Sequence, residues 1–345
     1  MRAVEDGPSS AVRVKAPPGL TLQAVQAPIR SSLDQVSQAM GRIVSSELPL
    51  VGLVSSHLLA MRGKMFRPTL LLLASEIEGE NADGRKNQAV EIAASLELIH
   101  LATLVHDDAV DHSALRRGMP TVNAMFSHQI SVIMGDFLYS TALTQLVGLG
   151  DLEALQALTR ASTEMTLGEM RQLAVTEPLD FTESEYYDLI RSKTASLMRA
   201  ACELGAIAGA RRHRQALGDY GENLGMAFQI TDDLLDYREV KETTGKPSGL
   251  DLREHKVTLP LIYALRAMPA KSKREVERAF AADSVSDADI AAIVRIVEEG
   301  GGFEYARARG EKFAERAEEA LLDLPDTAAR ASLSDAISYV MERHS

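Results

Sequence analysis

Two stretches of this chain each carry three aspartates at the same spacing. The first trio is Asp107, Asp108 and Asp111, and the second is Asp232, Asp233 and Asp236. Positions i and i+4 share a helical face, so the first and last aspartate of each trio point the same way. Like charges at that spacing repel unless cations lie between them. Because Mg²⁺ binds carboxylate and phosphate oxygens together, each trio indicates a metal–phosphate site.

A single trio could also be a solvated acidic helix end followed by a basic loop. Two such trios, each following a separate apolar helical segment, are harder to explain as solvent-exposed acidic residues without a function. If the two helices face each other, six carboxylates line one cavity, which is electrostatically prohibitive without cations. Arg116 and Arg117 follow the first trio after four intervening residues. Their guanidinium groups suit a diphosphate, so we expect metal ions and a diphosphate in the same cavity.

The elements that must position these residues are helical. Ala, Leu, Glu, Arg and Met dominate with period-3.6 spacing, and strand signals are nearly absent, which predicts an all-α protein. Several predicted helices exceed twenty residues, which favours a single large helical bundle around a central cavity. The predicted helices span 31–47, 48–62, 67–79, 84–112, 120–148, 151–175, 182–210, 212–239, 257–267, 270–280, 287–299, 301–323 and 327–342. The Gly- and Pro-containing stretch 240–257 is either a functional lid or a slack connection.

Length and composition narrow the class of protein. The 345 residues show no linker, so we expect a flexible tail over residues 1–20 and one helical domain over residues 21–345. The net charge of −12 argues against a nucleic-acid partner. No apolar run approaches 18 residues and no secretory signal is present, so we expect a cytoplasmic protein without a transmembrane segment. The single cysteine, Cys202, excludes an internal disulfide and lies in a predicted buried helix.

The flanks of the trios carry a resemblance to a known family. The segments L-I-H-L-A-T-L-V-H-D-D-A-V-D-H-S-A-L-R-R-G and F-Q-I-T-D-D-L-L-D-Y resemble the aspartate-rich motifs of the trans-isoprenyl diphosphate synthases, the polyprenyl synthetase family. The resemblance runs from about Gly63 to Pro260 and extends weakly to the C-terminus. It implies the isoprenoid synthase fold, a homodimer, and head-to-tail condensation of isopentenyl diphosphate with an allylic diphosphate. It also implies about three Mg²⁺ ions held by the six aspartates.

A basic segment, Gly63 to Pro68, precedes an apolar helix, where backbone N–H groups favour an anion. By itself this segment could be an ordinary helix start with surface cations. It matches the family pattern G-G-K-x-x-R-P except that Arg62 replaces the first glycine. The resemblance implies that the diphosphate of isopentenyl diphosphate is bound by Lys64, Arg67, His100 and Arg117.

The same resemblance implies a second set of residues for the allylic diphosphate. Lys193 alone could be an exposed lysine, but its small and apolar neighbours favour an inward position. Two further lysines resemble lid residues that close over the leaving diphosphate, although His255 replaces the glycine that is common before the second of them. The implied set is Arg116, Lys193, Thr194, Gln229, Lys246 and Lys256. The residues implied in catalysis are Asp107, Asp108, Asp111, Arg116, Lys193, Asp232 and Lys246.

Product length depends on the space beneath the first trio. Ala102 and Thr103 occupy the positions where the family's length control begins, and both are small, so the mouth of the tunnel is open. Six isoprene units need about 30 Å, the length of roughly twenty helical residues. Similarity to quinone side-chain synthases implies a product of roughly C30 to C40. We expect the tunnel floor at Phe137, Ala142 and Leu146, although these apolar residues could simply pack the core.

Three alternatives remain open at this point. The nearest is a geranylgeranyl or farnesyl diphosphate synthase with a shallower tunnel. A terpene cyclase would replace the second aspartate trio and would lack Lys64, Arg67 and His100. A non-catalytic subunit of a heteromeric synthase would lose one trio, whereas both are intact here.

Overall fold

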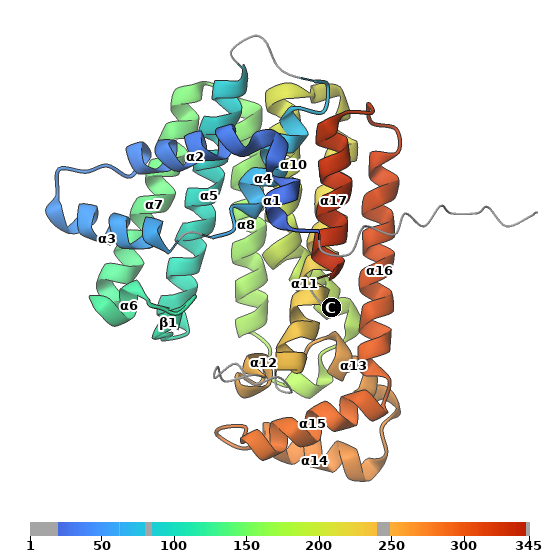
Figure 1. Cartoon of the computed structure of the whole chain (residues 1–345). Helices are drawn as coiled ribbons and strands as arrows, with labels where there is room; N and C mark the ends of the chain where they lie inside the picture. Colours follow the sequence, from blue (N-terminus) through green and yellow to red (C-terminus); the bar gives the residue numbers. More distant parts are fainter. Residues whose placement is uncertain (1–19, 62, 80–84, 240–248, 343–345) are drawn as a thin grey trace, which may run out of the picture.

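The computed structural model describes residues 20–61, 63–79, 85–239 and 249–342. Within these ranges almost all regular structure is helical, so the all-α prediction is confirmed (Figure 1). The predicted flexible tail lies outside the described residues except for Leu20, and so does Lys246.

The elements fall into two halves of the chain. The first half contains α1 (Leu22–Val25), η1 (Ala27–Ile29), α2 (Arg30–Ile43), α3 (Pro49–Ala60), α4 (Phe66–Ser75), α5 (Arg85–Val110), β1 (Leu115–Arg116), β2 (Met119–Pro120), α6 (Val122–Met125), α7 (His128–Leu149) and α8 (Leu152–Leu173). The second half contains η2 (Pro178–Asp180), α9 (Glu183–Ile190), η3 (Arg191–Ala195), α10 (Ser196–Gly209), η4 (Arg211–His213), α11 (Arg214–Glu239), α12 (Leu250–Arg253), α13 (Leu259–Ala267), α14 (Ala270–Phe280), α15 (Asp287–Glu299), α16 (Gly302–Leu321) and α17 (Ala328–Glu342).

Three local features differ from the secondary structure that the sequence predicts. The predicted helix 120–148 is interrupted, because Ser127 caps a new helix by accepting a hydrogen bond from the backbone N–H of Ile130 at 3.2 Å. The predicted helix 182–210 is also not uniform, because η3 is a π-helical turn between α9 and α10. The third difference is a two-stranded antiparallel ladder of β1 and β2 directly after the first aspartate trio.

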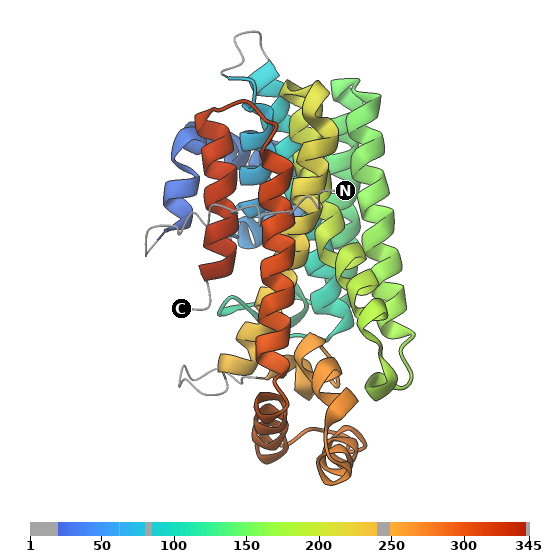
Figure 2. The ribbon, with the colours of Figure 1, turned by 90° about the vertical axis from the view of Figure 1, so that its right-hand side faces the viewer.

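The long helices form one bundle with their axes roughly aligned (Figures 1 and 2). Helix α5 packs along α7 and α2, α10 packs against α4, α8 and α11, and α11 packs along α16. Helices α14 and α15 lie at the lower end of the bundle in both views. Cys202 of α10 is fully buried, as the sequence predicted, and burial raises the pKa of its thiol.

Two helices are apolar and long enough to cross a bilayer, by length and composition alone. The apolar part of α5 is 67% buried within the protein, as expected for a core helix. The apolar part of α7 is only 33% buried, so much of its apolar surface faces outward. The sequence-based statement that no such run exists was therefore too strong, although one or two such helices are weak grounds for a membrane span.

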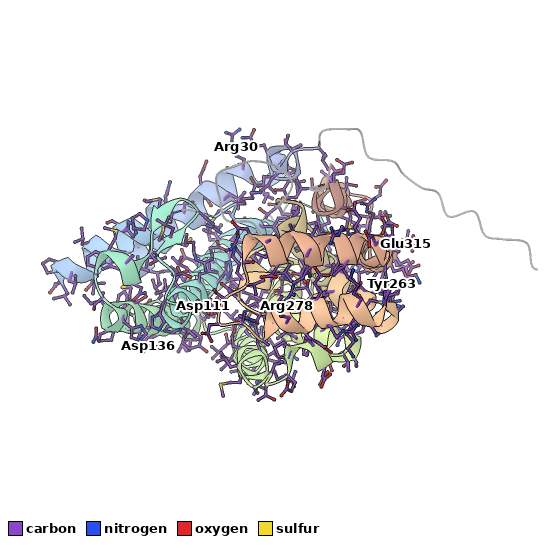
Figure 3. All side chains as sticks on the ribbon, turned by 90° about the horizontal axis from the view of Figure 1, so that it is seen from below. Arg30, Asp111, Asp136, Tyr263, Arg278 and Glu315 are labelled. Carbon is purple, nitrogen blue, oxygen red and sulfur yellow. The ribbon has the colours of Figure 1, made fainter. Side chains whose placement is uncertain are left out.

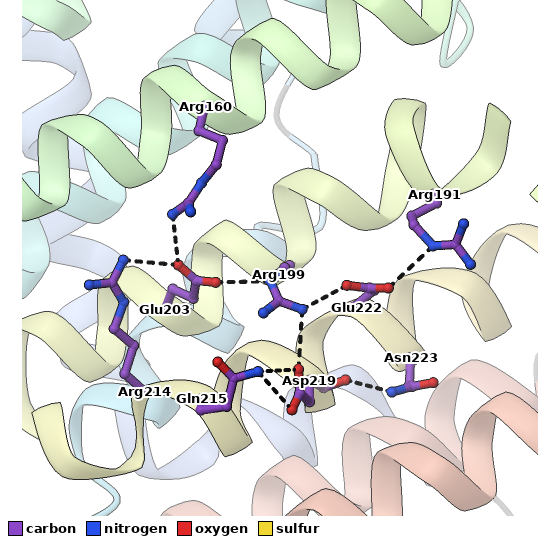
Figure 4. Close-up of polar contacts among 9 residues, drawn as sticks. All are labelled: Arg160, Arg191, Arg199, Glu203, Arg214, Gln215, Asp219, Glu222 and Asn223. Carbon is purple, nitrogen blue, oxygen red and sulfur yellow. Dashed lines mark hydrogen bonds and ion pairs between the residues drawn. The ribbon is translucent and has the colours of Figure 1, made fainter. Parts of the chain in front are cut away.

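A buried carboxylate ties three helices of the bundle together (Figure 4). Glu203 of α10 is 7% exposed and accepts hydrogen bonds from Arg160 of α8 at 3.2 Å, Arg199 at 2.9 Å and Arg214 of α11 at 3.2 Å. Arg199 also donates to Glu222 of α11 at 2.7 Å. A buried charge satisfied in this way fixes the spacing of α8, α10 and α11, because removing one partner would leave the charge uncompensated.

Candidate active site

Both aspartate trios contribute to one cavity of about 530 Å³ at the lower part of the bundle. Asp111 and Asp233 line it, together with Lys193, Thr194 and Gln229. Seen from below, Asp111 lies near the middle of this end of the molecule (Figure 3). A cavity of this size falls in the range of small-molecule sites.

The first trio ends helix α5. Asp107 and Asp108 lie in its last turn, and the backbone N–H of Asp111 donates to the carbonyl of Asp107 at 2.8 Å, so the trio keeps helical geometry. Burial, and next the charge of Glu169, raise the pKa of Asp107 to about 6, while Lys193 acts in the opposite direction. Cations in this cavity would therefore stabilise Asp107 in its ionised form.

Two neighbouring arginines of the β1–β2 hairpin, Arg116 and Arg117, bind different partners. Arg117 and Gly118 both have positive φ, +52° and +77°, as a tight two-residue hairpin turn requires. Arg116 donates from Nε to both oxygens of Asp108, at 2.8 Å and 2.9 Å. Arg117 donates from Nη1 to the carbonyl of Met61 at 3.0 Å. One arginine is thus joined to the first trio and the other to the segment before α4.

Gly63 makes the approach of Arg117 possible. A Cβ on Gly63 would lie 2.9 Å from Nη1 and 3.1 Å from Nη2 of Arg117. The same segment turns sharply at Met65, which has a φ of +52° and precedes α4. The glycine in the basic segment therefore has a steric role that spacing alone did not reveal.

A second basic cluster forms where α4 faces α5. Arg67 donates from Nη1 to Nε2 of His100 at 3.0 Å. Because a guanidinium group can only donate, Nε2 must be the accepting nitrogen of the ring. Burial, and next the charges of Arg67 and Arg117, hold the pKa of His100 well below its usual value, so the ring is neutral at pH 7. Lys64 is exposed and donates to Tyr339 Oη of α17 at 3.1 Å.

The second trio lies on α11 and belongs to a chain of hydrogen bonds. Asp233 is 5% exposed and accepts from Tyr186 Oη at 2.6 Å and from Gln229 Nε2 at 2.7 Å. Gln229 Oε1 in turn accepts from Thr194 Oγ1 at 2.7 Å. Burial, and next the charge of Asp251, raise the pKa of Asp233 well above its usual value. The side chains of Thr194 and Gln229 are therefore held in fixed orientations beside the cavity.

Helix α12 closes over the second trio. The carboxylate of Asp236 accepts from the backbone N–H groups of Leu250 at 3.0 Å and Asp251 at 3.1 Å. Burial and Asp236 raise the pKa of Asp251 to about 7. Lys256 lines the cavity and donates to Glu254 at 2.5 Å. The described end of the 240–257 stretch is thus attached to the acidic cluster.

The π-helical turn η3 presents Lys193 to helix α8. Its ammonium group forms an ion pair with Glu169 and donates to Gln172 Oε1 at 3.1 Å. Two glycines let this turn pack closely on both sides. A Cβ on Gly168 of α8 would lie 3.1 Å from the backbone nitrogen of Lys193, and one on Gly225 of α11 would lie 2.6 Å from Ala195 Cα.

The carboxylates suit hard divalent cations. Within the described ranges, no three His, Cys, Asp or Glu side chains converge closely enough to hold an ion by themselves. Mg²⁺ in phosphate sites is held by one or two carboxylates together with phosphate oxygens and water. Burial, and next the charges of neighbouring carboxylates, raise the pKa values of Asp107, Asp233 and Asp251, and bound cations would favour the ionised forms of these groups. The residues therefore fit Mg²⁺ ions whose ligand shell includes a diphosphate.

The residues expected along the tunnel are mostly packed in the core. Ala102, Ala142 and Leu146 are each at most 1% exposed. Thr103 donates from Oγ1 to the carbonyl of His100 at 2.7 Å, and Phe137 is partly buried. None of the five lines the 530 Å³ cavity. The tunnel and its floor remain predictions.

Several contacts of the site carried no signal in the sequence. Glu169 and Gln172 lie three residues apart on an ordinary amphipathic helix, and both bind Lys193. Tyr186 and Tyr339 come from segments far from their partners in the chain. Asp251 is different, because its place in the loop after the second trio marks it as part of a candidate lid.

The fold and the cavity define an all-α protein of the isoprenoid synthase fold, with two acidic helices sharing one cavity. The sequence model of the family described as polyprenyl synthetase matches residues 49–297. The chain belongs to this family, and it is a prenyltransferase, a polyprenyl diphosphate synthase.

Individual relatives support this family assignment, because they align with the chain over nearly their whole length. The chain is 36% identical over 322 residues to an all-trans-nonaprenyl-diphosphate synthase (geranyl-diphosphate specific) of Rhodobacter capsulatus, covering 93% of this chain and 98% of that one. It is 35% identical over 328 residues to heptaprenyl diphosphate synthase component 2 of Geobacillus stearothermophilus, covering 94% and 99%. The crystal structure of a polyprenyl synthase from Caulobacter crescentus CB15, complexed with calcium and isoprenyl diphosphate, superposes with a TM-score of 0.87 at 31% identity, covering 96% and 100%.

Proposed function

We propose that this chain condenses isopentenyl diphosphate head to tail with an allylic diphosphate, with Mg²⁺ bound at the two aspartate trios. The observation that carries this proposal is the single cavity to which Asp111 and Asp233 both contribute. The calcium and isoprenyl diphosphate bound to the Caulobacter relative support a divalent cation and a diphosphate as ligands of this chain.

The allylic diphosphate would bind in the 530 Å³ cavity. Asp107, Asp108, Asp111, Asp232, Asp233 and Asp236 would hold about three Mg²⁺ ions, which when bound supply positive charge to the leaving diphosphate. Lys193 approaches from the π-helical turn and Arg116 from the hairpin, and both can bind diphosphate oxygens. Thr194, Gln229 and Lys256 line the same space, and Lys246 is proposed for the lid.

Isopentenyl diphosphate would bind at the cluster of Lys64, Arg67, His100 and Arg117. The separate directions of Arg116 and Arg117 support two distinct diphosphate sites, one on each side of the hairpin. The neutral His100, which accepts from Arg67, helps to fix that guanidinium for bidentate binding of a phosphate group.

The reaction needs no nucleophilic side chain. The carbon–oxygen bond of the allylic diphosphate breaks and leaves an allylic cation, and the double bond of isopentenyl diphosphate attacks it. The proton then lost from the new chain passes to the departing diphosphate. The barrier is charge separation, which Arg116 and Lys193 lower by binding the leaving group.

The product is proposed to be roughly C30 to C40 long, of the kind used in quinone side chains. The small residues Ala102 and Thr103 beneath the first trio support an open path for the growing chain. The two curated relatives described above are named for products of different lengths, so similarity alone does not choose one.

We propose that the protein forms a homodimer through helix α7. Val132, Ile133 and Val147 of this apolar helix are 37%, 67% and 63% exposed. A second copy covering them would bury a surface that is unusually apolar for a monomer. We also propose one helical domain over residues 21–345 and a cytoplasmic location without a membrane span, because α5 is a core helix and the dimer would cover α7.

The relative named as component 2 favours one alternative, a subunit that acts only within a heteromeric synthase. The purified chain should be incubated alone with Mg²⁺, isopentenyl diphosphate and farnesyl diphosphate, and the products weighed by mass spectrometry. A product of roughly C30 to C40 is expected. Arrest at farnesyl or geranylgeranyl length would indicate a short-chain synthase. No turnover by the folded chain would favour the subunit.

A further inference from the structure

Glu97 is a buried acidic residue that the proposed reaction does not use. It lies on α5, ten residues before Asp107, and is 8% exposed. Its Oε2 is buried and has no hydrogen-bond partner in the described part of the chain. The Nε of Arg67 is also buried and has no partner among the residues that the structure describes. Unsatisfied buried polar atoms are uncommon, and these two belong to the same cluster.

The surroundings of Glu97 are basic. It lines a small cavity of about 50 Å³ together with His100 and Arg117, and the apolar side of this cavity includes Leu58 of α3 and Met40 of α2. The charged groups that act on Glu97 are Arg67 of α4 and Arg117 of the hairpin. The cavity has room for water beside its polar groups. Among the described residues, Glu97 is thus the acidic group and Arg117 the charged basic group of a pocket whose other lining is mostly apolar.

Two opposing effects set the protonation of this carboxyl. Burial favours the neutral form, and the two arginines favour the ionised form. Burial dominates and raises the pKa of Glu97 to about 7. Glu97 can therefore gain or lose a proton near neutral pH.

We propose that Glu97 takes up a proton when the diphosphate of isopentenyl diphosphate binds at Arg67, His100 and Arg117, so that this carboxyl makes the affinity for that substrate depend on pH. The inference rests on the proposed binding site for isopentenyl diphosphate. An anion placed against the same two arginines competes with the carboxylate for their charge and repels it. The neutral carboxyl removes this repulsion and can donate a hydrogen bond from its O–H.

The sign of the pH dependence follows from linkage. If Glu97 is neutral in the complex and ionised in the free protein, affinity falls as pH rises above about 7, by up to tenfold for each pH unit. The diphosphate has the opposite dependence, because its last proton leaves near pH 6 and the more highly charged form binds better. Affinity should therefore be greatest between about pH 6 and pH 7.

Titration calorimetry tests this directly. Isopentenyl diphosphate alone, without metal or allylic substrate, is titrated into the protein between pH 6.5 and 8.5, in two buffers with different enthalpies of ionisation. For the unchanged protein we expect proton uptake near pH 8 and a Kd that rises by up to tenfold per pH unit. Glu97→Gln should abolish both effects and bind more tightly than the unchanged protein at pH 8.5. Glu91→Gln, on the same helix but paired with Arg42, should keep the original profile.

Several outcomes would overturn the inference. If the unchanged protein takes up no proton when it binds isopentenyl diphosphate at pH 8, the inference is wrong, and no variant is needed to show it. A Glu97→Gln protein that binds more weakly at every pH would show that the ionised carboxylate only holds Arg67 in place. Arg67→Ala separates this inference from the proposed function. If that change leaves the Kd unaltered, the substrate site itself is wrong. If it weakens binding while Glu97→Gln keeps the original pH profile, only the role of Glu97 is wrong.

Discussion

The Nε of Arg116 lies 2.8 Å and 2.9 Å from the two carboxylate oxygens of Asp108. This ion pair joins the hairpin to the end of α5, so the first aspartate trio and the arginine behind it form one unit. Asp108 is 4% exposed, and burial raises its pKa while Arg116 opposes the rise. A bound diphosphate would therefore meet a guanidinium that is already oriented beside the carboxylates proposed to bind Mg²⁺.

Replacing one aspartate of either trio should remove nearly all turnover. With saturating Mg²⁺ and both substrates, Asp107→Ala or Asp232→Ala should lower kcat by at least about 100-fold, because charge stabilisation of the leaving diphosphate is lost. Radiolabelled isopentenyl diphosphate incorporation measures this. Asp283→Ala, on an exposed turn after α14, is the matched control and should retain activity. Near-normal turnover in either trio variant would contradict the metal role.

Gly63→Ala should weaken the binding of isopentenyl diphosphate selectively. The new Cβ would lie 2.9 Å from Nη1 of Arg117, so the guanidinium must shift, and we expect its hydrogen bond to Met61 to be lost. That bond contributes about 1 kcal/mol, so the KM for isopentenyl diphosphate should rise by about fivefold or more. The KM for the allylic substrate should not change, as steady-state kinetics with each substrate varied would show.

The matched control for that variant is Gly41→Ala on α2, where an added Cβ meets no atom within 4 Å. It should leave both KM values unchanged. Equal effects of Gly63→Ala on the two substrates would mean that Arg117 does not serve isopentenyl diphosphate alone.

Ala102→Tyr should shorten the product. A phenol ring at this buried position beneath the first trio would block the path of the growing chain. The longest product should then fall from roughly C30–C40 to about C20 or less, as mass spectrometry would show. Ala331→Tyr, at an exposed position of α17, controls for the added ring. If a folded Ala102→Tyr protein makes a product of unchanged length, the growing prenyl product does not pass Ala102.

Glu97→Gln should change how stability depends on pH. Burial raises the pKa of Glu97 from its ordinary value of 4.5 to about 7 in the folded protein. The folded state therefore binds the proton more tightly than the unfolded chain, and stability is lost as pH rises from about 4.5 to about 7. This loss amounts to at most about 3 kcal/mol at pH 8. Urea unfolding at pH 5 and pH 8 should show a smaller decrease for Glu97→Gln than for the unchanged protein; equal decreases would mean that Glu97 titrates normally.

The sequence by itself determined the helical class and the residues of the two trios. Their chemistry depends on the i and i+4 spacing of Asp107 with Asp111 and of Asp232 with Asp236, which is a local property of a helix. The apolar, period-3.6 helices that carry them could be predicted for the same reason. The family resemblance then implied roles for the basic residues, whose motif positions are also local.

Only the tertiary structure decided which side chains meet. Arg116 and Arg117 bind different partners at a turn where Arg117 and Gly118 have positive φ, and the bond of Tyr186 to Asp233 joins residues 47 positions apart. Within the described residues Glu97 Oε2 has no hydrogen-bond partner, and the raised pKa of Glu97 depends on burial by other helices and on charges from α4 and the hairpin. Such contacts arise from packing between distant segments, so residue spacing along the chain does not encode them.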